Sequence, residues 1–133
     1  GPMHSKLVEA AGPTVEFRTD RYGDASDAEL ERLLTTARGF IFGAEEDFGI
    51  VTVEALAAGT PVIGLAKAGT LDIVEDGVSG VLFKEQSVYS VMQAIKKAEK
   101  IQFNPATLQR KAKRFDKALF INKIRKVVAD NVR

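Results

Sequence analysis

The chain has 133 residues, of which 45% are hydrophobic and 28% charged, and its formal net charge is +1. This composition is typical of one globular domain, and no run of about 18 apolar residues is present that would span a membrane. Cysteine is absent, which excludes disulfides and thiolate chemistry, and we expect a cytoplasmic protein, either free or at the cytoplasmic face of a membrane.

The charges are unevenly distributed along the chain. Acidic residues exceed basic ones in residues 1–95, and basic residues exceed acidic ones in residues 96–133. A basic segment either binds nucleic acid or anionic lipid, or forms a solvated helical face that meets the acidic part of the same molecule. No aromatic residues are interleaved for base stacking, so we expect no nucleic-acid partner and leave membrane association open.

The first third of the chain contains a short segment that resembles a tag remnant, followed by the start of a folded domain. Residues 1–4 resemble the scar of a protease tag, and residues 5–133 are expected to form a single domain. Ser26 and Glu29 match a capping box, which predicts a helix over residues 27–37. Before it we expect the end of a helix at 5–11 and a strand at 15–18, and after it a buried strand at 39–42.

The rest of the chain alternates between helices and strands. The expected helices are 49–59, 70–75, 87–99, 105–113 and 117–130, and the expected strands are 61–64 and 80–83. Such alternation predicts an α/β fold with a Rossmann-like parallel sheet of about four strands flanked by helices.

Two carboxylates, Glu46 and Glu54, stand eight residues apart with Gly49 between them. The start of the helix near Gly49 offers backbone N–H groups at the positive end of the helix dipole, which is suited to a phosphate. Eight residues span at most about 12 Å, so one carboxylate at each end would reach hydroxyl groups on either side of a diphosphate. A nucleotide-diphospho-sugar fits this pattern; the alternative is that both are ordinary solvated acids.

The residues around this pair resemble the signature of the family 4 retaining glycosyltransferases. The resemblance is carried by residues 46–63, supported by 67–74 and 76–83, and it extends over roughly residues 8–100. It implies the carboxyl-terminal, donor-binding domain of the GT-B fold. Within the family the motif is most similar to that of bacterial and archaeal hexosyltransferases, including mannosyltransferases of polysaccharide biosynthesis.

The resemblance also implies roles for individual residues. Glu46 would act at the catalytic centre by contacting the donor-sugar hydroxyls, and Glu54 would hold the ribose. The backbone N–H groups of Phe48, Gly49 and Ile50 would bind the sugar and distal phosphate, and that of Val51 the diphosphate. The donor would be a UDP- or GDP-sugar, with no metal and no other cofactor.

The sequence departs from the family at several points. Gly43 stands where many relatives have proline, and Ala68 replaces the first glycine of a Gly-Gly pair. Two βα units of the family's donor domain and its whole amino-terminal acceptor domain have no counterpart in the given sequence. We therefore expect an incomplete domain with little transferase activity of its own, and an open edge at strand 39–42 that is closed by strand 15–18 or by a homodimer. The alternative function is a non-catalytic scaffold or interaction module.

Other candidate residues have weaker support. Lys67 either contacts the diphosphate or is an exposed loop lysine, and Asp72 either meets the donor or caps a short helix. Arg18 and Arg21 follow the first strand, where relatives bind the nucleobase. The single histidine, His4, is given no role. The terminal aromatic residues are expected to anchor helices in the core: Phe103, Phe115 and Phe120.

Overall fold

The computed structural model describes residues 12–14, 27–43 and 50–115. The expected elements at 5–11, 15–18 and 117–130 lie outside these ranges. The chain divides into two compact units, residues 1–30 and 31–133. In the first unit the described residues form a turn at 13–14 and the beginning of helix α2 (Asp27–Thr36), which continues into the second unit.

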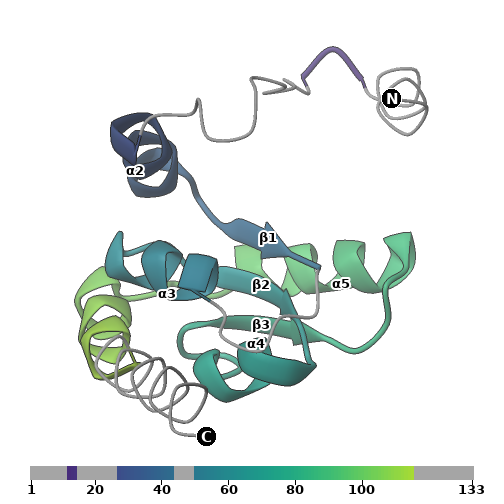
Figure 1. Cartoon of the computed structure of the whole chain (residues 1–133). Helices are drawn as coiled ribbons and strands as arrows, with labels where there is room; N and C mark the ends of the chain where they lie inside the picture. Colours follow the sequence, from purple (N-terminus) through teal and green to yellow (C-terminus); the bar gives the residue numbers. More distant parts are fainter. Residues whose placement is uncertain (1–11, 15–26, 44–49, 116–133) are drawn as a thin grey trace, which may run out of the picture. The chain divides into compact units, whose positions relative to one another are not determined.

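The centre of the second unit is a parallel sheet. Strands β1 (Phe40–Phe42), β2 (Val62–Leu65) and β3 (Gly80–Phe83) lie in the order β1-β2-β3 (Figure 1). Both pairings are parallel, as expected when a helix connects each strand to the next. The predicted α/β class with a parallel sheet is therefore confirmed, with three strands in the described part of the chain.

The helices begin and end close to the predicted residues. They are α2, α3 (Ile50–Ala57), α4 (Ala68–Ile73), α5 (Val88–Glu99) and a helix that starts at residue 105 and is described to residue 115. Helix α3 ends before Gly59, whose φ of 82° lies in the left-handed region that favours glycine. The start of α5 is capped by Ser87, whose hydroxyl accepts a hydrogen bond from the Ser90 N–H.

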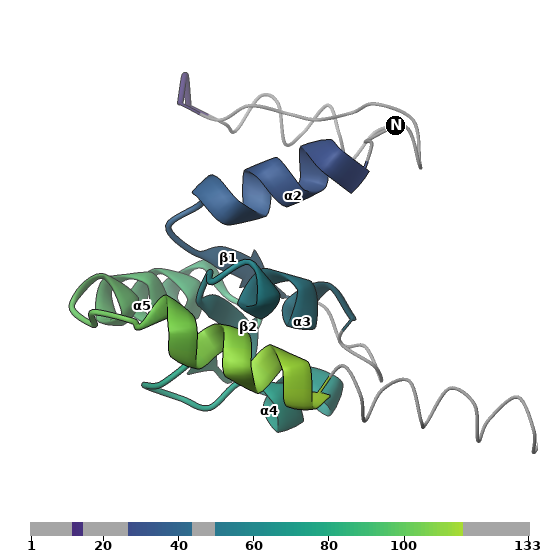
Figure 2. The same ribbon diagram turned by 90° about the vertical axis from the view of Figure 1, so that its left-hand side faces the viewer.

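Apolar clusters pack against both faces of the sheet. On one side, Ile63, Leu65, Val81 and Phe83 pack against Ala94 of α5. On the other side a larger cluster joins α3, the end of α4 and the helix that starts at residue 105 (Figure 2). Phe103 packs against both clusters and Phe115 against the larger one, which confirms their expected role as core anchors; Phe120 lies outside the described residues.

Strand β1 was predicted to be buried, and that prediction is wrong. Ile41 is 51% exposed, and Phe40 and Phe42 are only partly buried. Alternate side chains of a strand point to opposite faces, and α5 lies over β2 and β3, so the Ile41 face of β1 is left uncovered. Within the described ranges β1 pairs with β2 alone; the expected homodimer at its other edge stays a prediction.

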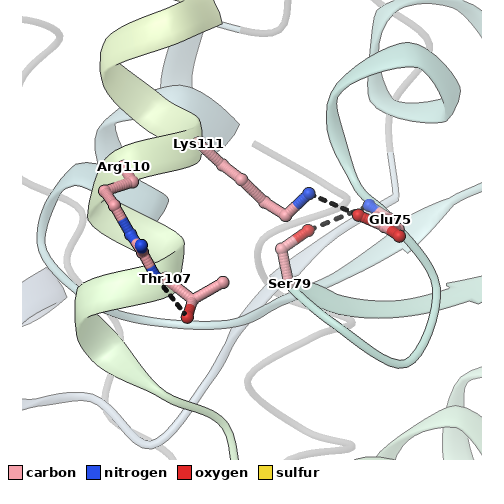
Figure 3. Close-up of polar contacts among 5 residues, drawn as sticks. All are labelled: Glu75, Ser79, Thr107, Arg110 and Lys111. Carbon is pink, nitrogen blue, oxygen red and sulfur yellow. Dashed lines mark hydrogen bonds and ion pairs between the residues drawn. The ribbon is translucent and has the colours of Figure 1, made fainter.

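Residues of the basic segment meet acidic residues of the same molecule. Lys97 Nζ lies 3.2 Å from Asp76 Oδ2, and Lys111 forms an ion pair with Glu75. Figure 3 shows the side chain of Lys111 pointing to Glu75, whose backbone N–H donates to the hydroxyl of Ser79. These pairs favour the interpretation of the basic segment as a face that contacts the acidic part. In the described ranges, no helix has the length and apolarity needed to cross a bilayer.

Candidate functional site

The candidate site lies at the carboxyl edge of the sheet. Because the strands are parallel, β1, β2 and β3 all end there, at Phe42, Leu65 and Phe83. The connections that leave this edge lead to the first residues of α3, α4 and α5. In open α/β sheets this is the edge at which ligands bind.

Helix α3 sets the orientation of Glu54. Val53, Ala55 and Leu56 are buried in the larger apolar cluster, and Thr52 is fully buried as well. Glu54 is exposed on the remaining face of this helix. Burial of its neighbours fixes the rotation of the helix, so the carboxylate of Glu54 faces solvent at the edge of the core.

The described part of the chain brings three of the predicted site residues together on one helix. Ile50 is the first residue of α3, Val51 is the second, and Glu54 lies one turn further along. Backbone N–H groups at the start of an α-helix have no partner within the helix, and such helix starts can bind anions. Glu46, Phe48 and Gly49 lie outside the described residues, so their predicted roles, like those of the other three, stay predictions.

The connection between β2 and α4 packs tightly against the sheet. A Cβ added to Gly64 would lie 2.5 Å from the methyl carbon of Thr70, so α4 approaches the backbone of β2 more closely than an alanine would permit. The hydroxyl of Thr70 is buried and has no hydrogen-bond partner among the described residues. Lys67 is exposed at the N-cap of α4, and the next residue, Ala68, has a φ of 49°.

Ala68 therefore occupies the left-handed region that glycine adopts at little steric cost. This backbone conformation suits the glycine that the resemblance implies at this position. Asp72 is exposed and is the fifth residue of α4, whose N-cap is Lys67 and C-cap Val74. The interpretation of Asp72 as a helix cap is therefore wrong. Arg18, Arg21 and His4 lie outside the described residues.

Sequence reasoning missed one residue at this edge, Gln86. Its side-chain Nε2 donates a hydrogen bond of 2.6 Å to the carbonyl oxygen of Gly43. The bond joins the connection that leaves β3 to the connection that leaves β1, across 43 residues of sequence. No pattern of spacing or hydrophobicity marks such a contact, because its acceptor is a backbone atom.

The described residues hold no group of three or more His, Asp or Glu side chains that would bind a metal ion. Glu54 is exposed on α3, four residues after Ile50, with which that helix begins. This arrangement offers hydrogen-bond donors to an anion and an ionised acceptor to hydroxyl groups.

The model of the family described as "Glycosyl transferases group 1" matches residues 7–118. The chain belongs to this family. The match confirms the resemblance of the motif at Glu46 and Glu54 to a family of glycosyltransferases, and the parallel sheet with its flanking helices is consistent with the Rossmann-like domain of the GT-B fold.

Curated relatives support the same assignment. The chain is similar to the D-inositol 3-phosphate glycosyltransferase of Mycolicibacterium smegmatis, with 42% identity over 65 residues, and to that of Geodermatophilus obscurus, with 45% over 51 residues. It is also similar to the sucrose synthase of Acidithiobacillus caldus, with 44% identity over 54 residues. These matches cover 49%, 38% and 39% of the chain but only 14%, 11% and 7% of the relatives.

Proposed function

We propose that this chain is the donor-binding part of a retaining glycosyltransferase. The protein would transfer a hexose from a UDP- or GDP-sugar to a glycan or to a lipid-linked acceptor. The observation that supports this most directly is the exposed Glu54 on α3, one turn from the amino end of that helix and at the carboxyl edge of the sheet, in a chain of a glycosyltransferase family.

The proposed role of α3 is to stabilise the negative charge that develops during sugar transfer. Transfer of the sugar leaves negative charge on the departing nucleoside diphosphate. Backbone N–H groups at the start of α3, from Gly49 to Val51, and the positive end of the helix dipole would stabilise that charge without a metal ion. Glu54 would accept hydrogen bonds from the ribose hydroxyls, and Glu46 and Phe48 would contact the transferred sugar.

The relatives' names support glycosyl transfer and differ in the compound that they state, D-inositol 3-phosphate in one case and sucrose in the other. The acceptor is therefore proposed only by class. If the chain binds no donor, the remaining candidate is a scaffold or interaction module, for which the uncovered Ile41 face of β1 offers an apolar surface.

The proposal predicts saturable binding of UDP, GDP or their sugars, measured by calorimetry and by amide NMR. Glu54→Ala removes an ionised acceptor, so we expect affinity to fall about 10- to 100-fold. Ligand addition should shift the amide signals of residues 48–54.

Glu99→Ala is the matched control, because Glu99 is an exposed acid at the end of α5. It makes the same change of charge and should bind as the unaltered chain does. Absence of saturable binding at millimolar ligand, or equal losses in both variants, would contradict donor binding at Glu54.

A further inference from the structure

The connection between β1 and α3 carries Glu46, the predicted contact to the donor sugar. Its two ends are described: Gly43 follows β1, and Ile50 begins α3. The Ile50 end is fixed by the buried residues of α3, as shown above. The position of the Gly43 end depends on what holds its backbone.

Gln86 holds that end through the 2.6 Å hydrogen bond to the Gly43 carbonyl. Gln86 adjoins the start of α5. It immediately precedes Ser87, the N-cap of α5, and the Ser87 N–H donates to the carbonyl of Glu85 at 2.8 Å. The first turn of α5 thereby sets the position from which the Gln86 side chain reaches across the edge of the sheet.

The surroundings of this bond are apolar. Gln86 and Gly43 line an open groove of ≈ 400 Å³ between α5 and β1, whose other described lining residues are Ile41, Phe83, Ser87, Val88, Val91 and Met92. Only Gln86 and Ser87 among these carry polar side chains, and the hydrogen bond to the Gly43 carbonyl comes from Gln86. Within this lining, Gln86 is thus the side chain that fixes the Gly43 carbonyl.

We propose that Gln86 is a positioning residue for donor-sugar recognition. It acts by holding the Gly43 carbonyl, three residues before Glu46 in the sequence. This inference rests on the proposed function. Glu54 and the first turn of α3 are held by the core and do not depend on Gln86. Loss of the bond should therefore weaken the binding of the sugar more than the binding of the nucleotide.

The test replaces Gln86 by methionine, which has similar length and no donor. GDP, GDP-mannose, UDP and UDP-glucose are titrated into each variant by calorimetry. In Gln86→Met we expect the preference for the sugar nucleotide over the free nucleoside diphosphate to fall about 2- to 10-fold, as for loss of one hydrogen bond. Affinity for the free nucleoside diphosphate should change less than about 2-fold.

Two further variants serve as controls. Gln93→Met makes the same change at an exposed position of α5 and should leave the preference unchanged. Gly43→Ala keeps the carbonyl, and a Cβ there would meet no atom of the described residues within 4 Å, so it should also keep the preference. In the ligand-free chain, amide signals of residues 43–46 should shift in Gln86→Met more than those of residues 50–54.

The outcomes separate the two proposals. Sugar-nucleotide binding with an unaltered preference in Gln86→Met overturns the role of Gln86 and leaves donor binding intact. An equal loss of affinity for the nucleotide and for the sugar nucleotide indicates a general structural effect and also overturns the role of Gln86. No binding by the unaltered chain overturns the proposed function, and the role of Gln86 with it.

Discussion

At the scale of single residues, Ala68 shows how the backbone constrains the choice of amino acid. Its φ of 49° places an L side chain in the left-handed region, at a cost of about 1–2 kcal/mol per residue, whereas glycine adopts it freely. Ala68→Gly should therefore raise the free energy of unfolding by about 0.5–1 kcal/mol, after the extra entropy of glycine in the unfolded chain is included. Urea denaturation monitored by circular dichroism measures the change.

Ala98→Gly is the control, because the same substitution there is expected to lower the free energy of unfolding. Ala98 is the penultimate residue of α5, and glycine costs up to about 1 kcal/mol relative to alanine in a helix, so Ala98→Gly should destabilise. Equal losses in both variants would show that the backbone at Ala68 is not strained. The sequence revealed that Ala68 is unusual for its family but not the sign of its φ, because that angle is set by the packing of α4 on β2.

At the scale of elements, the contact between β2 and β3 depends on Gly80. A Cβ at this position would lie 1.8 Å from the Val62 carbonyl oxygen, so the two strands would have to separate. Gly80→Ala should destabilise the protein by at least about 3 kcal/mol, since a backbone atom in a close-packed core moves little. The midpoint of urea denaturation is the measurement.

Gly39→Ala is the matched control. A Cβ at Gly39 would meet its nearest heavy atoms at 3.7 and 3.8 Å, which is ordinary contact. We expect its stability to stay within about 1 kcal/mol of that of the unaltered chain. A well-folded Gly80→Ala variant with unchanged stability would contradict the strand spacing described here.

The elements themselves could be predicted from local sequence. Apolar runs placed β2 and β3, and 3.6-residue periodicity placed α5, because both signals arise within the segment. The exposure of Ile41 and the bond from Gln86 to Gly43 could not be predicted in this way. Each depends on which distant element lies beside β1, and the sequence of one segment does not determine which other segments lie next to it in space.

At the scale of the whole molecule, opposite charges from distant parts of the sequence are paired. The carboxylate of Asp76 accepts from the Leu82 N–H at 2.9 Å and from Lys97 at 3.2 Å. The bond from Leu82 is the largest cause, burial opposes it as the second largest, and the hydrogen bond and charge of Lys97 add smaller effects that lower the pKa further. Together they lower the pKa of Asp76 below its usual value of 3.8.

A lowered pKa in the folded state has a defined consequence for acid stability. The stabilisation from Asp76 is fully present above its unfolded pKa of 3.8 and is lost as the pH falls through the lower folded pKa. Asp76→Asn should therefore lose less stability than the unaltered chain does as the pH falls from about 6 to about 2. Urea denaturation at a series of pH values measures this difference.

Lys97→Met separates the two causes. It removes the ion pair but leaves the bond from the Leu82 N–H, which is the larger cause of the lowered pKa. Its acid sensitivity should therefore lie closer to that of the unaltered chain than to that of Asp76→Asn. If Lys97→Met instead matches Asp76→Asn, the ion pair between the basic and acidic parts of the chain dominates, and the bond to the backbone of β3 is the minor cause.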